Sequence, residues 1–129
     1  MVDLALGTMA RADKGPVAPP PPLDEPLAAV SRVVAGWPGV VATCHWDLHD
    51  ASRVDGVDFY VGEHELGHVH LDGSLHLATS PALGAALVAQ GLARPFRYQR
   101  GWVCEQVGRI GPQAAVALFE RNYVRLAGS

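Results

Sequence analysis

The chain has 129 residues, which is enough for one domain with a hydrophobic core and short for two. Hydrophobic residues make up 49% of it, and 10 basic residues against 13 acidic ones give a formal net charge of -3. The basic residues form no run, which argues against nucleic acid and anionic membranes as main partners. Because no stretch approaches about 18 apolar residues and the first residues lack the basic and apolar regions of a secretion signal, we predict a soluble cytoplasmic protein.

Prolines near the N-terminus separate two kinds of sequence. Six of them lie between positions 16 and 26 and favour an extended polyproline backbone, which does not pack as a helix. We therefore predict a disordered or extended proline-rich tail over residues 1–23 and a single folded domain over residues 24–129.

Capping residues and residue spacing predict three helices. The first has Asp24 as its N-cap and ends near Gly36, the second begins at Ser80-Pro81 and is stopped by Gly91, and the third begins at Gly111-Pro112. Residues at helical spacing are predicted to face the core: Leu27, Val30 and Val34 in the first helix, Leu83, Leu87 and Val88 in the second, and Ala115, Leu118, Phe119, Asn122 and Leu126 in the third.

Extended segments lie between these helices. Strands are predicted over residues 40–46 and 57–62, in both arms of a hairpin within 64–77, and in two short segments, 96–98 and 102–107, joined around Arg100-Gly101. Because the connections have hairpin length, the pairing should be antiparallel. The predicted class is α+β, with a mainly antiparallel sheet of about five strands and helices packed on one face.

The hairpin holds four of the six histidines: His64, His68, His70 and His76. A two-residue loop at Asp72-Gly73 would leave both faces of the hairpin mixed, because side chains alternate along a strand. A three-residue loop over 72–74 puts leucines and valines on one face of the hairpin. The imidazoles of His68, His70 and His76 then lie on the opposite face. This loop pairs His70 with His76 directly and makes His68 their diagonal neighbour. We predict the three-residue loop, with His64 peripheral.

Three imidazoles on one sheet face have three interpretations. They could form a metal site with open positions, a metal-free pocket in which histidines bind and deprotonate an acidic organic substrate, or a solvated polar face. We favour the pocket without a metal, with His68, His70 and His76 as its catalytic residues. A divalent metal on the same three histidines is the alternative.

A second histidine group precedes the hairpin. His45 and His49, with Asp47 and Asp50, offer another metal cluster near Cys44, although the polarity expected of a loop explains these residues equally well. The two cysteines, Cys44 and Cys104, are far apart and are predicted to be free buried thiols.

The run VDFYVGEHELGHVHLDGSLHL, followed by SPALGAALVAQGLA, GWV and AVALFERNY, resembles the fungal-luciferase-like domain family, which also occurs in small bacterial proteins. The resemblance covers roughly residues 37–124. It implies an oxygenase that adds molecular oxygen, as co-substrate, to a hydroxylated styryl pyrone without a recognised organic cofactor. It also implies that the three histidines bind and deprotonate the enol of such a substrate.

Other residues take supporting roles in this interpretation. Alternation along the strand puts Glu65 on the face opposite the histidines, so a structural role is predicted for it, as for Asp72 and Gly73 in the turn. Candidate substrate-binding residues are Trp102, Phe96 and Tyr98.

The sequence departs from the family at one place. Family members commonly carry a histidine shortly after the second helix, but residues 94–98 here contain none. We therefore keep two alternatives to an oxygen-dependent oxidoreductase. One is a non-catalytic module that binds a small molecule, and the other is a metal-dependent enzyme. The sequence predicts no oligomeric state.

Overall fold

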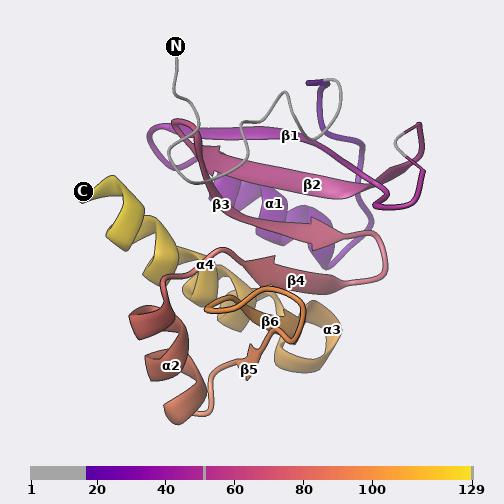
Figure 1. Cartoon of the computed structure of the whole chain (residues 1–129). Helices are drawn as coiled ribbons and strands as arrows, with labels where there is room; N and C mark the ends of the chain where they lie inside the picture. The colour runs from indigo at the N-terminus through magenta and orange to yellow at the C-terminus, as the bar shows by residue number, and fades with distance from the viewer. Residues whose placement is uncertain (1–16, 51, 129) are drawn as a thin grey trace.

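The computed structural model describes residues 17–50 and 52–128 (Figure 1). Most of the predicted tail, residues 1–16, lies outside the described part. Residues 17–23 form neither helix nor strand, and the carbonyl of Ala18 accepts a hydrogen bond of 2.9 Å from the backbone of Cys44. No helix within the described residues is both long and apolar enough to span a membrane.

A six-stranded antiparallel sheet forms the centre of the fold, with strand order β1-β2-β3-β4-β6-β5. The predicted α+β class and antiparallel pairing are confirmed, with one strand more than the five expected. The strands are β1 (Val40–Trp46), β2 (Val54–Val61), β3 (His64–His70), β4 (Ser74–Leu77), β5 (Arg94–Pro95) and β6 (Val103–Gln106).

The short strands near residue 100 differ from the prediction. The extended pair is β5 with β6, so residues 96–98 are not a strand. They belong to a turn in which the backbone of Phe96 donates to Trp102 and the backbone of Trp102 donates to Gln99. The turn therefore begins at Phe96, directly after Pro95.

The helices are α1 (Leu27–Ala35), α2 (Pro81–Ala89), α3 (Val107–Ile110) and α4 (Pro112–Ala127). Ser80 caps α2 as predicted, because its side chain accepts a hydrogen bond from the backbone of Leu83. Helix α1 begins later than predicted, with Pro26 and not Asp24 at the cap position. The short α3 was not predicted, and Val88 of α2 is more than a third exposed, because it lies one position past the buried Leu87.

The hydrophobic core lies between the sheet and the long helices. Helices α1 and α4 pack against each other and against β1, β2 and β3 on one face of the sheet, behind it in Figure 1. Phe59 and Phe119 meet edge to face across this boundary at 5.5 Å. The fully buried members of the core each contribute about 1.5 to 3 kcal/mol through removal from water, and they include Val30, Val34, Val57, Leu66, Val69, Leu75, Leu77 and Leu87.

The histidine hairpin keeps the predicted faces but not the predicted register. The structure pairs Val69 with Leu75 and His68 with His76, two residues away from the expected pairing of His70 with His76. The turn is Leu71–Gly73, which leaves Leu71 about half exposed instead of on the core face. Because a shift of two residues preserves the side-chain alternation, the imidazoles still share one face.

A bulge interrupts β3 just before the first of these histidines. Phe59 pairs with Gly67 while its neighbour Tyr60 pairs with Glu65, so Leu66 is the extra residue. Gly67 has a φ of 157°, and a Cβ placed on it would lie 2.5 Å from the carbonyl oxygen of His76. Glycine is therefore required where the bulge brings β3 against β4.

Candidate functional site

One row of side chains crosses the face of the sheet opposite α1 and α4. Direct cross-strand pairing joins Asp58 to His68, His68 to His76, and His76 to Cys104, and Cys104 pairs in turn with Arg94. Directly paired residues lie on the same face. The row therefore runs from β2 to β5 with two imidazoles at its centre.

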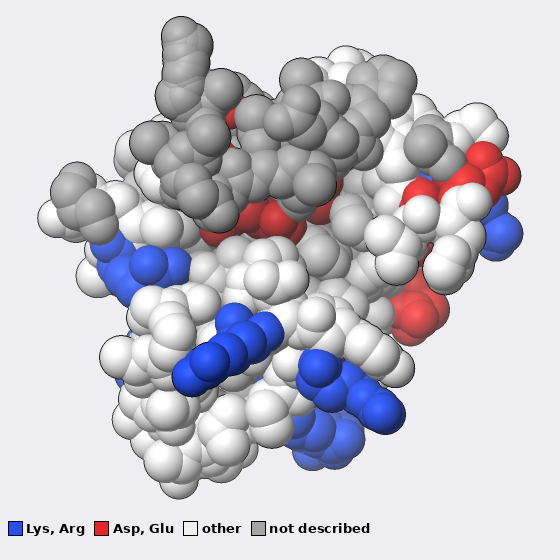
Figure 2. All heavy atoms as spheres, in the orientation of Figure 1, with Lys and Arg blue, Asp and Glu red and all other residues white. Residues whose placement is uncertain are grey.

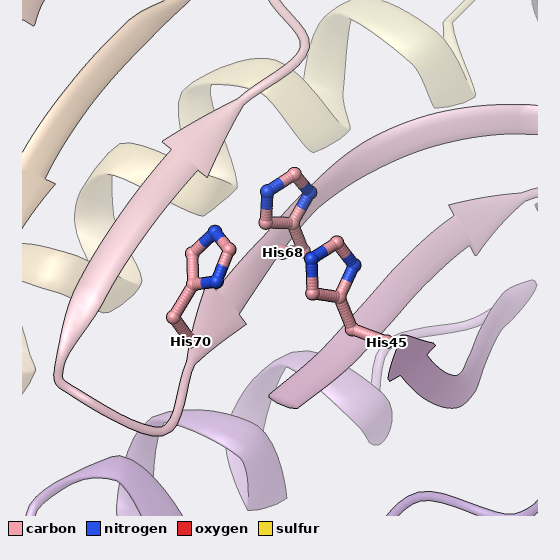
Figure 3. Close-up of side chains that lie close together, drawn as sticks. All are labelled: His45, His68 and His70. Carbon is pink, nitrogen blue, oxygen red and sulfur yellow. The ribbon is translucent and has the colours of Figure 1, made fainter. Parts of the chain in front are cut away.

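Two further histidines flank this row, and one ligand atom from each of His45, His68 and His70 lies within 4.8 Å of the other two. Figure 3 shows these three rings close together, although His45 comes from β1 and the other two from β3, with β2 between the two strands. His76 completes the group: its Nδ1 lies 2.9 Å from Nε2 of His68 and 3.2 Å from Nε2 of His70. We call these four residues the histidine cluster.

Three rings of the cluster are held by carboxylates. Nδ1 of His45 donates to Asp58 at 2.7 Å, Nδ1 of His68 donates to Glu65 at 2.7 Å, and Nδ1 of His70 donates to Asp55 at 2.8 Å. A carboxylate only accepts, so it fixes the ring hydrogen on Nδ1 and leaves a lone pair on Nε2 of each neutral ring. The carboxylates of Asp58 and Glu65 are buried.

Burial keeps two of the rings uncharged. Loss of solvent lowers the pKa of His68, although its hydrogen bond to Glu65 acts in the opposite direction. Burial and the neighbouring imidazoles, first that of His68, lower the pKa of His76 to about 3. Both rings are therefore neutral at pH 7, and neutral imidazole is the form that accepts hydrogen bonds or binds a metal.

An aromatic wall stands beside the cluster. Phe96 stacks on His76 with ring centroids 4.2 Å apart, and Trp102 approaches the edge of His68 at 6.1 Å. Tyr98 contacts Phe96 at 5.7 Å but is 76% exposed. A pocket of about 250 Å³ lies on this side of the cluster, lined by residues that include His76, Arg94, Phe96, Tyr98 and Cys104.

The histidine hairpin and the aromatic wall lie within one recognised sequence segment. Residues 63–116 match the Luciferase domain family. The match confirms the predicted resemblance to a luciferase-like domain family. No curated protein and no solved structure matches the chain. The luciferase-like segment includes His68, His70 and His76, whereas the fourth imidazole of the cluster, His45, precedes it.

The surroundings of the histidine cluster differ from the prediction at Glu65. This residue was placed on the face opposite the histidines, but its carboxylate contacts His68. The extra residue of the bulge reverses the alternation, so positions 65 and 68 come to the same side. In the turn, the carboxylate of Asp72 accepts from the backbone and hydroxyl of Ser74, and Gly73 has a φ of 95°.

Sequence reasoning assigned His45 to a different group. It was considered with His49, Asp47 and Asp50, but Asp47 caps the backbone of His49 and Asp50 in an exposed loop, and Asp50 in turn caps Ser52. Loop capping accounts for these residues. His45 instead turns onto the sheet face and stacks on His68, with ring centroids 4.2 Å apart and planes 14° apart.

Two acidic members of the site were missed, Asp55 and Asp58. A signal was present, since both carboxylates interrupt a strand, β2, that otherwise contains only glycine, aliphatic and aromatic residues. A carboxylate placed within an otherwise buried strand requires a partner. That partner is an imidazole in each case, His70 for Asp55 and His45 for Asp58.

Proposed function

We propose that this luciferase-like domain binds a planar, enolic small molecule and oxidises it with molecular oxygen. The observation that supports the proposal is the position of the carboxylate-held histidine cluster directly against the aromatic wall of Phe96 and Trp102. Polar groups converging beside aromatic rings are typical of small-molecule sites. Pyrone-like enols and polyphenols have both features that such a site recognises, a flat ring and an acidic hydroxyl group.

Each half of the site has a separate task. Phe96 and Trp102 offer ring faces and edges to a flat substrate. The imidazole nitrogens that carry lone pairs accept the hydrogen bond of the acidic hydroxyl group, which aligns the enol with the histidine face. Asp55 and Glu65 fix the orientation of His70 and His68 through Nδ1, so the rings are positioned before the substrate arrives.

The reaction needs only the substrate and oxygen. The histidine face takes up the enol hydrogen, and the electron-rich carbon of the resulting enolate forms a bond to O2. The carbon is oxidised, O2 is reduced to the level of a peroxide, and the enol hydrogen ends on the terminal peroxide oxygen. The product is therefore a hydroperoxide that contains every atom of the two reactants, and no external reductant is consumed.

The test is oxygen consumption by the purified full chain with a panel of hydroxylated pyrones, other enols and polyphenols. We expect uptake with at least one compound and a decrease of about 100-fold or more in kcat/KM for His70→Ala, the range typical of losing a positioned acid or base. His64→Ala is the matched control, because His64 is exposed at the start of β3 and lies outside the cluster. Absence of uptake with every compound would contradict the proposed reaction.

A non-catalytic binding module is the second candidate function. It is favoured by one observation, that residues 94–98 supply arginines, a proline and two aromatic residues where family members commonly carry a histidine. Such a module would bind the same flat enols and release them unchanged. Stabilisation of the folded state by a compound, without oxygen uptake, would support this function over the first.

A further inference from the structure

We propose that His68, His70 and His76 bind one divalent transition-metal ion, through Nε2, Nε2 and Nδ1 respectively. The site uses the same ring lone pairs that the proposed reaction gives to the enol hydrogen, so with an ion bound the acidic hydroxyl group would meet the open position of the ion instead of a ring nitrogen. The inference goes beyond that reaction, however, because it rests on the arrangement of three nitrogen atoms and does not require turnover.

The three ring nitrogens that face one another carry too few hydrogens to bond to each other. The Nδ1 hydrogens of His68 and His70 are donated to Glu65 and Asp55, so Nε2 of each neutral ring carries only a lone pair. Both Nε2 atoms face the same atom, Nδ1 of His76, at 2.9 and 3.2 Å. A neutral His76 brings at most one hydrogen to this point. Three nitrogens thus converge with at most one hydrogen between them, an arrangement that a bound cation stabilises.

The distances and ring orientations suit coordination. Nitrogen ligands lie about 2.0 to 2.1 Å from Zn²⁺, so two of them in a tetrahedral site are about 3.3 to 3.4 Å apart. The separations of 2.9 and 3.2 Å from Nδ1 of His76 are close to this value. The rings of His68, His70 and His76 are also steeply inclined, at 67° to 82°. Steeply inclined rings can direct their in-plane lone pairs to one point.

The carboxylates around the rings also suit a metal ion. Imidazoles that bind metals usually donate their other ring hydrogen to a carboxylate or carbonyl, which sets the tautomer and raises ligand basicity. His68 and His70 do so, and Asp58 adds a second carboxylate oxygen 3.6 Å from Nδ1 of His68. The negative charge of these carboxylates also favours a cation over a neutral ligand.

The ligand atoms of the neighbouring group of His45, His68 and His70 lie within 4.8 Å of one another, but the ring geometry of this group is less suitable. His45 and His68 are stacked with their planes only 14° apart and their centroids 4.2 Å apart, so their in-plane lone pairs lie in two nearly parallel planes and do not meet at an ion close to both. We therefore place His45 beside the ion as a wall of the site. An all-nitrogen ligand set favours Zn²⁺, Co²⁺, Ni²⁺, Cu²⁺ or Fe²⁺ over Mg²⁺ and Ca²⁺, and three protein ligands leave a position open for substrate.

The test uses the full chain, treated with a chelator and then titrated with Co²⁺ and with Zn²⁺. We expect one equivalent of ion per chain by elemental analysis, visible Co²⁺ absorption with the intensity typical of four- or five-coordinate nitrogen sites, and a rise in Tm on loading. His70→Ala and His76→Ala should each weaken binding by at least about 100-fold. His64→Ala and His45→Ala should retain it.

Asp55→Asn tests the supporting carboxylate without removing a ligand. Loss of such a partner typically lowers metal affinity by about 10- to 100-fold. We expect that decrease with unchanged circular dichroism, whereas Asp50→Asn, in the exposed loop, should bind as the native chain does. Failure of the native chain to bind one equivalent of either ion would overturn the proposal, and loss of binding in His45→Ala would overturn the ligand assignment.

The metal proposal and the proposed function can fail separately. Metal binding without oxygen uptake would leave the metal site standing and contradict the proposed oxygenation. Oxygen uptake by a folded chain that binds no ion would contradict the metal site and leave the proposed reaction standing.

Discussion

The carboxylate of Glu65 accepts a hydrogen bond of 2.7 Å from Nδ1 of His68, three positions further along the same strand. In a regular strand these two side chains would point to opposite faces. The bulge at Leu66 brings them together, and burial of both groups makes the hydrogen bond costly to lose. The orientation of the central histidine therefore depends on an irregularity of the backbone.

Glu65→Gln should destabilise the fold through this contact. The amide keeps the shape of the side chain but exchanges a hydrogen bond to a charged group for a neutral one, so we expect a loss of about 1 to 2 kcal/mol in the free energy of unfolding. Urea denaturation measures it. Glu120→Gln, on the exposed side of α4, is the matched control and should change stability by less than about 0.5 kcal/mol. Equal effects of the two substitutions would contradict the role given to Glu65.

Gly67→Ala should be strongly destabilising. Its Cβ would lie 2.5 Å from the carbonyl oxygen of His76 and 3.0 Å from the ring of Phe119, at a φ of 157° that other residues rarely adopt. We expect a loss of about 2 to 4 kcal/mol, measured by thermal or urea denaturation. The control is Gly108→Ala in α3, where a Cβ meets nothing within 4 Å. That change should be neutral or stabilising by up to about 1 kcal/mol.

Asn122→Ala should destabilise the fold by removing the hydrogen bonds that join α4 to the bulge in β3. The side-chain amide of Asn122 is buried in α4 and donates to the carbonyls of Leu66 at 2.8 Å and Ala78 at 3.2 Å. Its loss leaves buried carbonyl groups with fewer donors, and we expect a cost of about 1 to 3 kcal/mol in urea denaturation. Gln113→Ala, exposed in the first turn of the same helix, should cost less than about 0.5 kcal/mol. A cost for Asn122→Ala as small as that of the control would show that these two hydrogen bonds contribute nothing to stability.

Stability should fall in acid partly through Glu105. Burial acts to raise the pKa of this carboxyl group, but its hydrogen bonds to Arg109 and to the backbone of Gln106 outweigh burial and hold the pKa below its ordinary value of 4.5. A group with a lowered pKa in the folded state stabilises the fold above its unfolded value, and this contribution is lost as the pH falls through the folded value. The free energy of unfolding, measured by urea denaturation at a series of pH values below 6, should therefore decrease less steeply with falling pH in Glu105→Gln than in the native chain. An unchanged pH dependence in this variant would refute the assignment.

The general form of the fold could be predicted because it follows from residue periodicity and capping. Ser80-Pro81 and Gly111-Pro112 mark the starts of α2 and α4, and the leucine face of the hairpin identifies the buried side of the sheet. The hairpin register was wrong by two residues, since periodicity reports only which face a residue occupies. Shifts of two residues leave the pattern unchanged.

The parts of the site that could not be predicted depend on contacts between distant strands. His45 joins the cluster because β1 pairs with β2, which sets His45 opposite Gly56, and Gly56 also lies opposite His70. The pairing of distant strands therefore determines that His45 lies beside His70, and the local sequence around His45 does not indicate this pairing. Glu65 was misplaced because a bulge is invisible to a rule based on strict alternation.

The row from His68 through His76 and Cys104 to Arg94 crosses one strand at each step. Neighbouring strands are about 4.8 Å apart, so the three steps of the row span about 14 Å. Two six-membered rings joined directly are shorter than this, whereas two rings joined through a two-carbon linker and carrying hydroxyl groups at both ends approach it. A molecule lying along the row with its acidic oxygen at the histidines would bring its far ring to Arg94, at the β5 edge of the sheet. Substrates of different length would then be distinguished at that edge, far from the imidazoles.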